Sequence, residues 1–109
     1  MSLHIARGTN TEMPQNLIGA YVPVFVVAQN HEEAAIRAVE KIREQGFEFL
    51  DIAHKKIDEI NPNQWNIFIN ESWPEYKNHF PEQQEILSKL HESLIFFGPF
   101  AGYESKNNA

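Results

Sequence analysis

The sequence predicts a small α+β domain with one sheet and helices packed against it. Short runs rich in β-branched and aromatic residues, at 20–28, 47–52 and 94–97, are typical of strands. Two longer runs, at 30–45 and from residue 81 onward, repeat apolar residues at helical spacing. With 109 residues and 42% hydrophobic composition, the chain has the size of one domain that buries its own core.

The expected element order is β-α-β-(β)-α-α-β, in a single-layer sheet of three or four strands with packed helices. Residues 1–16 are polar and without periodicity, so we expect a flexible N-terminal tail. The domain itself is expected over 17–104, and 105–109 form a polar C-terminal tail. If 64–70 formed a strand, the order would become β-α-β-β-α-β, which resembles the ferredoxin-like plait in element order alone.

Residues 20–28, AYVPVFVVA, form the first expected strand, with Leu17 and Ile18 leading into it. Both of its faces are apolar, so both have to be covered. Pro23 has no N–H for a sheet ladder, which places it at an edge, at a bulge or at the start of the strand. Because the strand is apolar on two faces, we expect that the protein self-associates as a homodimer.

Residues 30–45 carry a complete set of helix signals. Asn30 is an N-cap residue and Glu33 occupies the capping-box position. Gly46 follows where a left-handed C-terminal cap is expected. This helix is therefore predicted to lie between these two caps and to pack its small apolar side chains against the sheet.

Residues 47–52, FEFLDI, form the second expected strand. Its alternation changes phase at Leu50, and a bulge there would reconcile the two halves. The polar segment 54–60 fits an extended continuation, a short hairpin arm or one helical turn. We favour the extended form.

Residues 61–76, NPNQWNIFINESWPEY, fit either a helix or a strand. The dipeptide Asn61-Pro62 is typical of a helix start, with an N-cap followed by proline in the first turn. Pro74 follows the point where such a helix would stop. We therefore predict a helix over 62–72.

The C-terminal part is expected to add a further helix and the last strand. Pro81 opens the helix, and Glu85 with Lys89 makes an i,i+4 charge pair along it. The strand over 94–97 is interrupted by Gly98-Pro99, which indicates a kink or a sheet edge.

Charge is distributed unevenly along the chain, whose formal net charge is −6. Residues 1–56 carry seven acids and six bases, whereas 57–109 carry eight acids and three bases. We expect no nucleic acid and no membrane as partner, because an acidic half disfavours phosphate backbones and anionic lipids. No apolar run reaches the roughly 20 residues of a spanning helix. The chain has no cysteine, and we expect a cytoplasmic protein.

Catalytic and metal-binding motifs are missing from the sequence. The five histidines show no metal-ligand spacing, no serine stands in a nucleophile elbow, and the glycines form no phosphate-binding loop. A metal set assembled from distant residues would have Asp51, His54 and His79 as its best members. Surface or partly buried roles fit these residues better, so we expect no metal and no cofactor.

Aromatic residues are dense in the C-terminal half and are expected to belong mostly to the core. Trp73, Tyr76 and Tyr103 are the ones expected to be partly exposed. The candidate binding residues are Trp65, Trp73, Tyr76 and Tyr103. We expect a small soluble non-catalytic interaction or regulatory domain that presents its acidic, aromatic C-terminal half to another protein or to a second copy. The alternatives are a small-molecule-binding domain with an aromatic cleft and, third, an enzyme with dispersed His and Glu residues.

Overall fold

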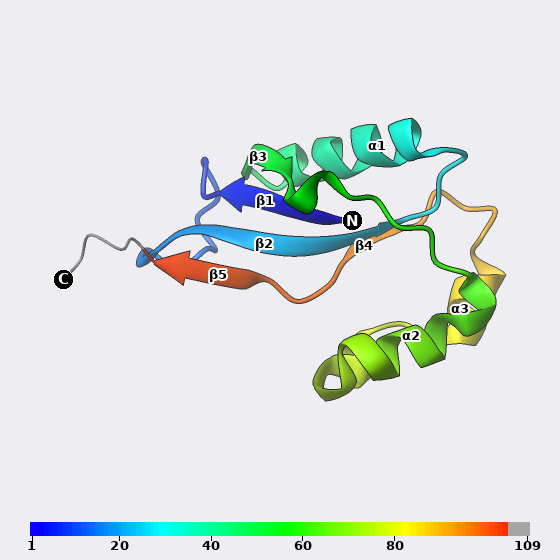
Figure 1. Cartoon of the computed structure of the whole chain (residues 1–109). Helices are drawn as coiled ribbons and strands as arrows, with labels where there is room; N and C mark the ends of the chain where they lie inside the picture. The colour runs from blue at the N-terminus through cyan, green and yellow to red at the C-terminus, as the bar shows by residue number, and fades with distance from the viewer. Residues whose placement is uncertain (105–109) are drawn as a thin grey trace.

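The computed structural model describes residues 1–104 and shows one antiparallel sheet with helices on both sides (Figure 1). The predicted α+β class is therefore confirmed. Within these residues five strands form the sheet, in the order β3-β1-β2-β4, and β5 also pairs with β2. The strands are β1 (Ser2–Ala6), β2 (Leu17–Val26), β3 (Glu48–Ile52), β4 (Ile95–Phe97) and β5 (Ala101–Glu104). The helices are α1 (His31–Glu44), α2 (Trp65–Ser72) and α3 (Gln83–Ser88), with 3-10 turns at Ala53–Lys55, Pro62–Gln64 and Pro74–His79.

The expected C-terminal tail at 105–109 lies outside the described residues. Within 1–104, no helix combines the length and the apolar character needed to cross a membrane.

The N-terminal segment differs most from its prediction. Ser2–Ala6 forms β1, which lies between β2 and β3 in the middle of the sheet. The side chains of Leu3 and Ile5 are completely buried. The expectation of a flexible tail over 1–16 is therefore wrong. Only two apolar residues alternate in this segment, which is less than the run of about four residues on which a strand assignment depends.

The loop that follows β1 is anchored as well. The Arg7 guanidinium donates hydrogen bonds to the carbonyl oxygens of Met13, Pro14 and Leu17, at 2.8, 2.6 and 2.7 Å. Met13 also buries its side chain in the core. Side chain to backbone bonds of this kind hold a polar loop without any hydrophobic periodicity.

Helix α1 covers one face of the sheet (Figure 1). Its buried residues Ala34, Ala38 and Ile42 recur one turn apart. Two of them are alanines, which let the helix axis approach the strands closely. The sheet residues in the same core are Leu3, Ile5, Ala20, Val22 and Val24.

Both predicted caps of α1 are present. The backbone N–H of Glu33 donates to Asn30 Oδ1 at 2.8 Å, as an N-cap requires. At the other end Gly46 has a φ of +84°, and the Phe47 N–H donates to the Ile42 carbonyl at 3.2 Å. This reversed bond is part of a Schellman motif, so the helix ends where the sequence predicted.

Residues 62–72 are helical, which confirms the choice made from their capping signals. Asn61 Oδ1 accepts a hydrogen bond from the Asn63 N–H at 2.9 Å, and Pro62 follows in the first turn. A ferredoxin-like order would require a strand at 64–70, and that condition is not met.

The opposite face of the sheet is covered by α2, α3 and the turn between them, but only at one end. Phe25 of β2 lies at the centre of this cover, with five aromatic rings at centroid distances of 5.1 to 6.1 Å. We call these six residues the aromatic layer: Phe25, Trp65, Phe68, Trp73, Phe80 and Phe96. Most aromatic residues of the C-terminal half therefore serve the core, as expected.

Pro23 lies in the interior strand β2, at a break in its ladder. Strand β4 pairs with residues 24–26 of β2, and β5 pairs with 17–21. Residues 98–100 bulge out between the two strands, and Gly98 N–H donates to the Pro23 carbonyl at 2.8 Å. The proline is tolerated because its missing N–H falls at this irregularity. The predicted kink at Gly98-Pro99 is also explained.

The predicted bulge in β3 is present at Leu50. His4 of β1 pairs with Asp51, whereas the next residue, Ile5, pairs with Phe49. Leu50 is left without a partner and is exposed. The bulge places Asp51 on the same face of the sheet as His4.

The segment after β3 does not continue as an extended chain. Ala53–Lys55 forms a 3-10 turn in which His54 and Lys55 have φ values of 57° and 52°. The preference for an extended segment is therefore wrong at its start, where the backbone of His54 and Lys55 makes a left-handed turn in place of a continued strand. Periodicity cannot detect a turn of three residues.

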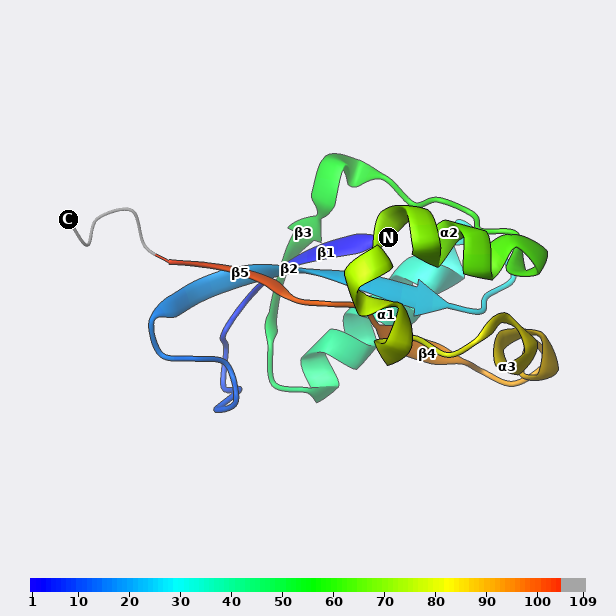
Figure 2. The same ribbon diagram turned by 90° about the horizontal axis from the view of Figure 1, so that it is seen from below.

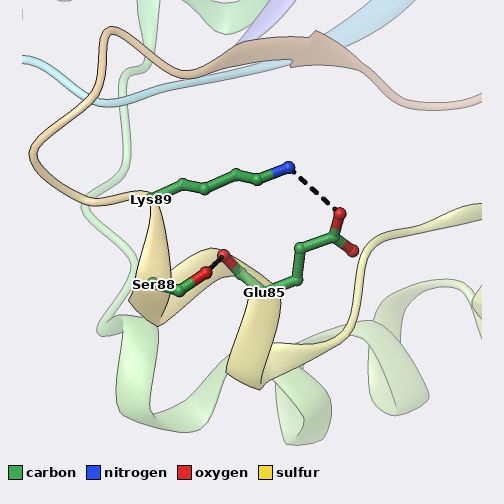
Figure 3. Close-up of polar contacts among 3 residues, drawn as sticks. All are labelled: Glu85, Ser88 and Lys89. Carbon is green, nitrogen blue, oxygen red and sulfur yellow. Dashed lines mark hydrogen bonds and ion pairs between the residues drawn. The ribbon is translucent and has the colours of Figure 1, made fainter.

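Helix α3 is short, and its predicted charge pair joins Glu85 to Lys89, the residue directly after the helix (Figure 3). Lys89 Nζ lies 3.2 Å from Glu85 Oε1, and Ser88 Oγ donates to the Glu85 carbonyl at 2.8 Å. Both charged side chains are solvent-exposed to a large extent, so this pair contributes only a few tenths of a kcal/mol.

One half of the second sheet face carries no helix among the described residues. In Figures 1 and 2, α1 lies on one side of the sheet, while α2 and α3 lie on the other side at one end only. The region where β5 runs beside the first half of β2 has no helix over it on the α2 side. This uncovered half contains the candidate functional site.

Candidate functional site

We call the uncovered half the open face. Its residues follow from strand pairing, because directly opposed residues of antiparallel strands project to the same side. One row across the sheet is Asp51–His4–Tyr21–Ala101. The neighbouring row is Glu48–Ala6–Gly19–Tyr103.

His4 is the centre of the open face. Its ring stacks on that of Tyr21, with centroids 4.6 Å apart and an interplanar angle of 13°. Its Nε2 lies 2.5 Å from Tyr103 Oη, and its Nδ1 lies 3.6 Å from Asp51 Oδ1. The imidazole is therefore held from three sides by residues of β2, β3 and β5.

Gly19 makes the contact between Tyr103 and His4 possible. A Cβ atom at Gly19 would lie 2.6 Å from Tyr103 Cζ and 2.9 Å from the Ile5 carbonyl oxygen. The tyrosine ring occupies the space that any side chain at this position would need. Because Gly19 has no side chain, the Tyr103 ring can lie over β2, and its hydroxyl reaches His4 on β1 beyond it.

The line Asp51–His4–Tyr103 has the residue types for proton transfer, but its surroundings argue against catalysis. The Asp51 side chain is 66% exposed. Neither of the two clefts described below is lined by any member of the line. A reaction site needs a concave, water-excluding surface, whereas this cluster lies on an open sheet.

A larger cleft lies at the covered end, between the ends of β2 and α1 and the helices of the aromatic layer. It has a volume of about 450 Å³, which is within the usual range for small-molecule sites. Its apolar lining includes Val24, Val26, Trp65, Ile86, Leu90 and Phe96. We call it the Trp65 cleft.

The rim of the Trp65 cleft is polar. His31 and Glu59 stand on it, with Nε2 3.2 Å from Oε1. The α-amino group of Met1 also borders it, and burial lowers the pKa of this amine, while the nearby Asp58 carboxylate opposes the effect. The cleft thus combines an apolar interior with charges of both signs at its entrance.

A second cleft of about 310 Å³ lies where the turn Pro74–His79 meets the break between β4 and β5. Tyr76, His79 and Pro99 are among its lining residues. Tyr76 is 43% exposed, and its ring centroid lies 6.2 Å from that of His79.

The four predicted binding residues do not form one site. Trp65 is only 3% exposed, and its Nε1 donates to the Pro81 carbonyl at 2.8 Å. Trp73 is partly exposed within the aromatic layer, Tyr76 lines the second cleft, and Tyr103 belongs to the open face. The expected partial exposure of Trp73, Tyr76 and Tyr103 is observed, but a binding role for any of the four stays a prediction.

His4, Tyr21 and Asp51 were not among the predicted site residues. The tail expected over 1–16 includes His4, and the sequence suggests Asp51 only as a possible metal ligand with His54 and His79. One local feature of the sequence points to this ring: in the alternation Leu3-His4-Ile5, His4 projects from the sheet face that does not carry the two apolar side chains. The partners of that ring depend on strand pairing, which one sequence does not reveal.

Asp51, His54 and His79 do not come together as a metal site. In the part of the chain that the structure describes, no three His, Cys, Asp or Glu residues are placed to hold a metal ion. His54, His79 and His91 are all exposed.

Comparisons with known proteins do not assign a role to any of these residues. No protein-family model, no curated protein and no solved structure matches this chain.

Proposed function

We propose that this chain is a small non-catalytic interaction or regulatory domain that binds another protein through its open face. The observation that carries the proposal is the His4–Tyr21–Tyr103 cluster, a set of fixed aromatic rings on an uncovered sheet. Aromatic residues of this kind dominate the energetics of protein interfaces. Because these rings are already ordered by their mutual contacts, they lose less side-chain entropy when a partner binds.

Charge supports a basic partner surface. The chain has a net charge of −6, and the open face carries the carboxylates of Glu48 and Asp51. Complementary charge speeds association and suppresses wrong partners. The same acidity is the basis for proposing that nucleic acid is not a partner.

The sequence analysis also predicts a homodimer, in which the partner is a second copy of the chain. Its original basis, the doubly apolar strand at 20–28, is weakened, because α1 covers one face and the aromatic layer covers the other around Phe25. An isologous dimer through the open face would place the carboxylate-bearing faces of both copies against each other, which like-charge repulsion disfavours. We therefore rank another protein above a homodimer. A cytoplasmic location is likewise proposed from the sequence, which has no cysteine.

Affinity capture with matched variants tests the proposal. Immobilised wild type, Tyr21→Ser and Ile67→Ser chains are incubated with a lysate of the source cells, and retained proteins are identified by mass spectrometry. Tyr21 is 42% exposed on the open face, and Ile67 is 59% exposed on α2. We expect a protein that is retained by wild type and Ile67→Ser but lost with Tyr21→Ser. Identical retention by all three chains would refute the open face as the contact surface.

A Tyr76→Ser chain in the same experiment separates the two exposed tyrosines. Tyr76 is as exposed as Tyr21 but lies at the second cleft. Loss of the partner with Tyr76→Ser alone would move the contact surface to that cleft. Light scattering of wild type over a concentration series tests the homodimer independently.

The Trp65 cleft favours small-molecule binding as a second function. Its volume and apolar lining suit a compact apolar molecule with a polar end at the rim. In a Trp73→Phe background Trp65 becomes the sole tryptophan, so its fluorescence reports on the cleft. A metabolite screen that changes this emission, with the change abolished by Ala34→Leu at the wall, would support the function. A screen without effect argues against it.

A further inference from the structure

The interior of the Trp65 cleft is apolar, and the polar atoms beside it are already hydrogen-bonded. The Nε1 of Trp65 points away from a ligand's use, because it donates to the Pro81 carbonyl at 2.8 Å. The backbone N–H of Val27 donates to the Leu94 carbonyl at 2.9 Å. Within residues 1–104, every buried nitrogen or oxygen of a side chain has a hydrogen-bond partner. A polar atom of a ligand would have to compete with these bonds, so the interior suits a body without polar atoms.

The charges on the rim of the cleft are paired within the chain. His31 Nε2 lies 3.2 Å from Glu59 Oε1, and Lys56 Nζ lies 3.6 Å from Asp58 Oδ1. All four side chains are more than half exposed, so water also solvates them. A charged ligand end would lose hydration as it approached the rim, and it would have to displace one of these partners to gain an ion pair. The rim therefore favours a ligand end without charge.

Uncharged polar groups stand at the same entrance. Gln29 and Asn30 line the cleft, and both residues are exposed. The Asn30 Oδ1 accepts the N-cap bond of α1 from the Glu33 N–H, but a side-chain amide also carries two N–H donors. Amide groups donate to, and accept from, a hydroxyl or an amide of a ligand. The entrance thus has groups that can hydrogen-bond an uncharged end.

We propose that the Trp65 cleft binds an uncharged amphiphile, with a compact aliphatic or aromatic body in the apolar interior and a hydroxyl or amide end at the rim. The inference rests on the second proposed function, small-molecule binding, and adds the chemical class of the ligand. The cleft volume of about 450 Å³ has room for such a body, and the aromatic rings of Trp65 and Phe96 give it a surface to pack against.

Three probes that share one hexyl chain test the class of the ligand: 1-hexanol, heptanoate and hexylammonium. Each is titrated into the full chain at neutral pH and constant ionic strength. Trp65 emission is read in the Trp73→Phe background, and the methyl NMR signals of Val24, Val26 and Ile86 locate the binding. We expect saturable changes with 1-hexanol and binding about tenfold weaker or less for both ions, because their ends lose hydration without gaining an unpaired counter-charge. Equal or tighter binding of either ion would overturn the proposal.

Chain length tests whether the body of the ligand is buried. Burying one further methylene should strengthen binding about fourfold, so 1-hexanol should bind about fifteenfold more tightly than 1-butanol. Equal affinities for the two alcohols would mean that the chain stays in water, and the proposal would be wrong.

Matched Ala→Leu variants decide whether the alcohol binds in the cleft. Ala28 and Ala34 both line it, and Ala28 is only partly buried, so a leucine there adds bulk with less risk to the core. We expect Ala28→Leu and Ala34→Leu each to weaken 1-hexanol binding by about tenfold or more. The control Ala101→Leu makes the same change at an exposed position of β5 outside the cleft and should leave binding unchanged. Undiminished binding in a cleft variant whose NMR dispersion shows it to be folded would overturn the site.

The outcomes separate this inference from the function on which it rests. If heptanoate or hexylammonium binds in the cleft as tightly as 1-hexanol, small-molecule binding stands and the uncharged class is wrong. If 1-hexanol has no effect, the inference is wrong, and the metabolite screen then decides the function by itself. The open face is not involved in either result, because the cleft lining does not include His4, Tyr21 or Tyr103.

Discussion

Replacing Leu3 with alanine tests whether the N-terminal segment is part of the core. Leu3 is completely buried in β1, between the two strands that flank it. Leu→Ala changes at such positions cost about 3–4 kcal/mol, as lost transfer free energy plus a term for the cavity that remains. A domain of this size has a total stability of about 5–15 kcal/mol, so the variant should lose about a fifth or more of it.

Urea unfolding, followed by tryptophan fluorescence and far-ultraviolet circular dichroism, measures the effect. With an m value of about 1.5 kcal/mol per molar urea, a loss of about 3 kcal/mol lowers the midpoint by about 2 M. The matched control is Ile18→Ala in β2, where the side chain is 50% exposed. The control should cost about 1 kcal/mol or less.

Two results would refute the assignment of β1 to the core. One is a midpoint for Leu3→Ala within about 0.3 M of the Ile18→Ala midpoint, which the m value converts to about 0.5 kcal/mol. The other is a chain lacking residues 1–16 that unfolds with the wild-type midpoint, as a flexible tail would allow. Hydrogen exchange adds a direct check, since the Leu3 and Ile5 amides should be among the protected ones.

Three further outcomes are expected. Gly19→Ala should destabilise the protein by about 1–3 kcal/mol, because the new Cβ overlaps Tyr103. It should also shift the NMR signals of the His4 ring, which Tyr103 contacts. Unchanged His4 signals would contradict that contact. Trp73→Ala should cost about 3 kcal/mol if the aromatic layer is core, whereas unchanged stability in urea with lost partner binding would make it an interface residue. The Met1 amine has a pKa lowered by burial, so the unfolded chain binds more protons than the folded one. The free energy of unfolding should therefore rise with pH up to about 8. N-terminal acetylation should remove that rise, as measured by urea midpoints across this pH range.

The elements predicted correctly are those whose signals are local. Asn30 and Gly46 mark the ends of α1 through bonds within a few residues. The helix at 62–72 was distinguished from a strand by its two terminal prolines. The phase change at Leu50 showed the bulge because a strand alternates strictly with a period of two.

The candidate site was not predictable in the same way. Of the open face, the sequence singles out Tyr103, for its exposure rather than its partners, and Asp51, as a possible metal ligand with His54 and His79. Its contact with His4 joins residues 99 positions apart in the chain. That contact also depends on Gly19, whose only distinguishing feature in the sequence is the lack of a side chain.

The sequence by itself determined the class of the domain, its best-marked helices and the net charge of the chain, because periodicity and capping are carried by neighbouring residues and charge by composition. Only the tertiary structure decided that Ser2–Ala6 is an interior strand, that six aromatic residues form one layer around Phe25, and that part of the second sheet face has no helix over it within residues 1–104. These features arise from the register between strands far apart in sequence. The register is selected by how all the buried side chains pack together, and no local stretch of the chain contains that information.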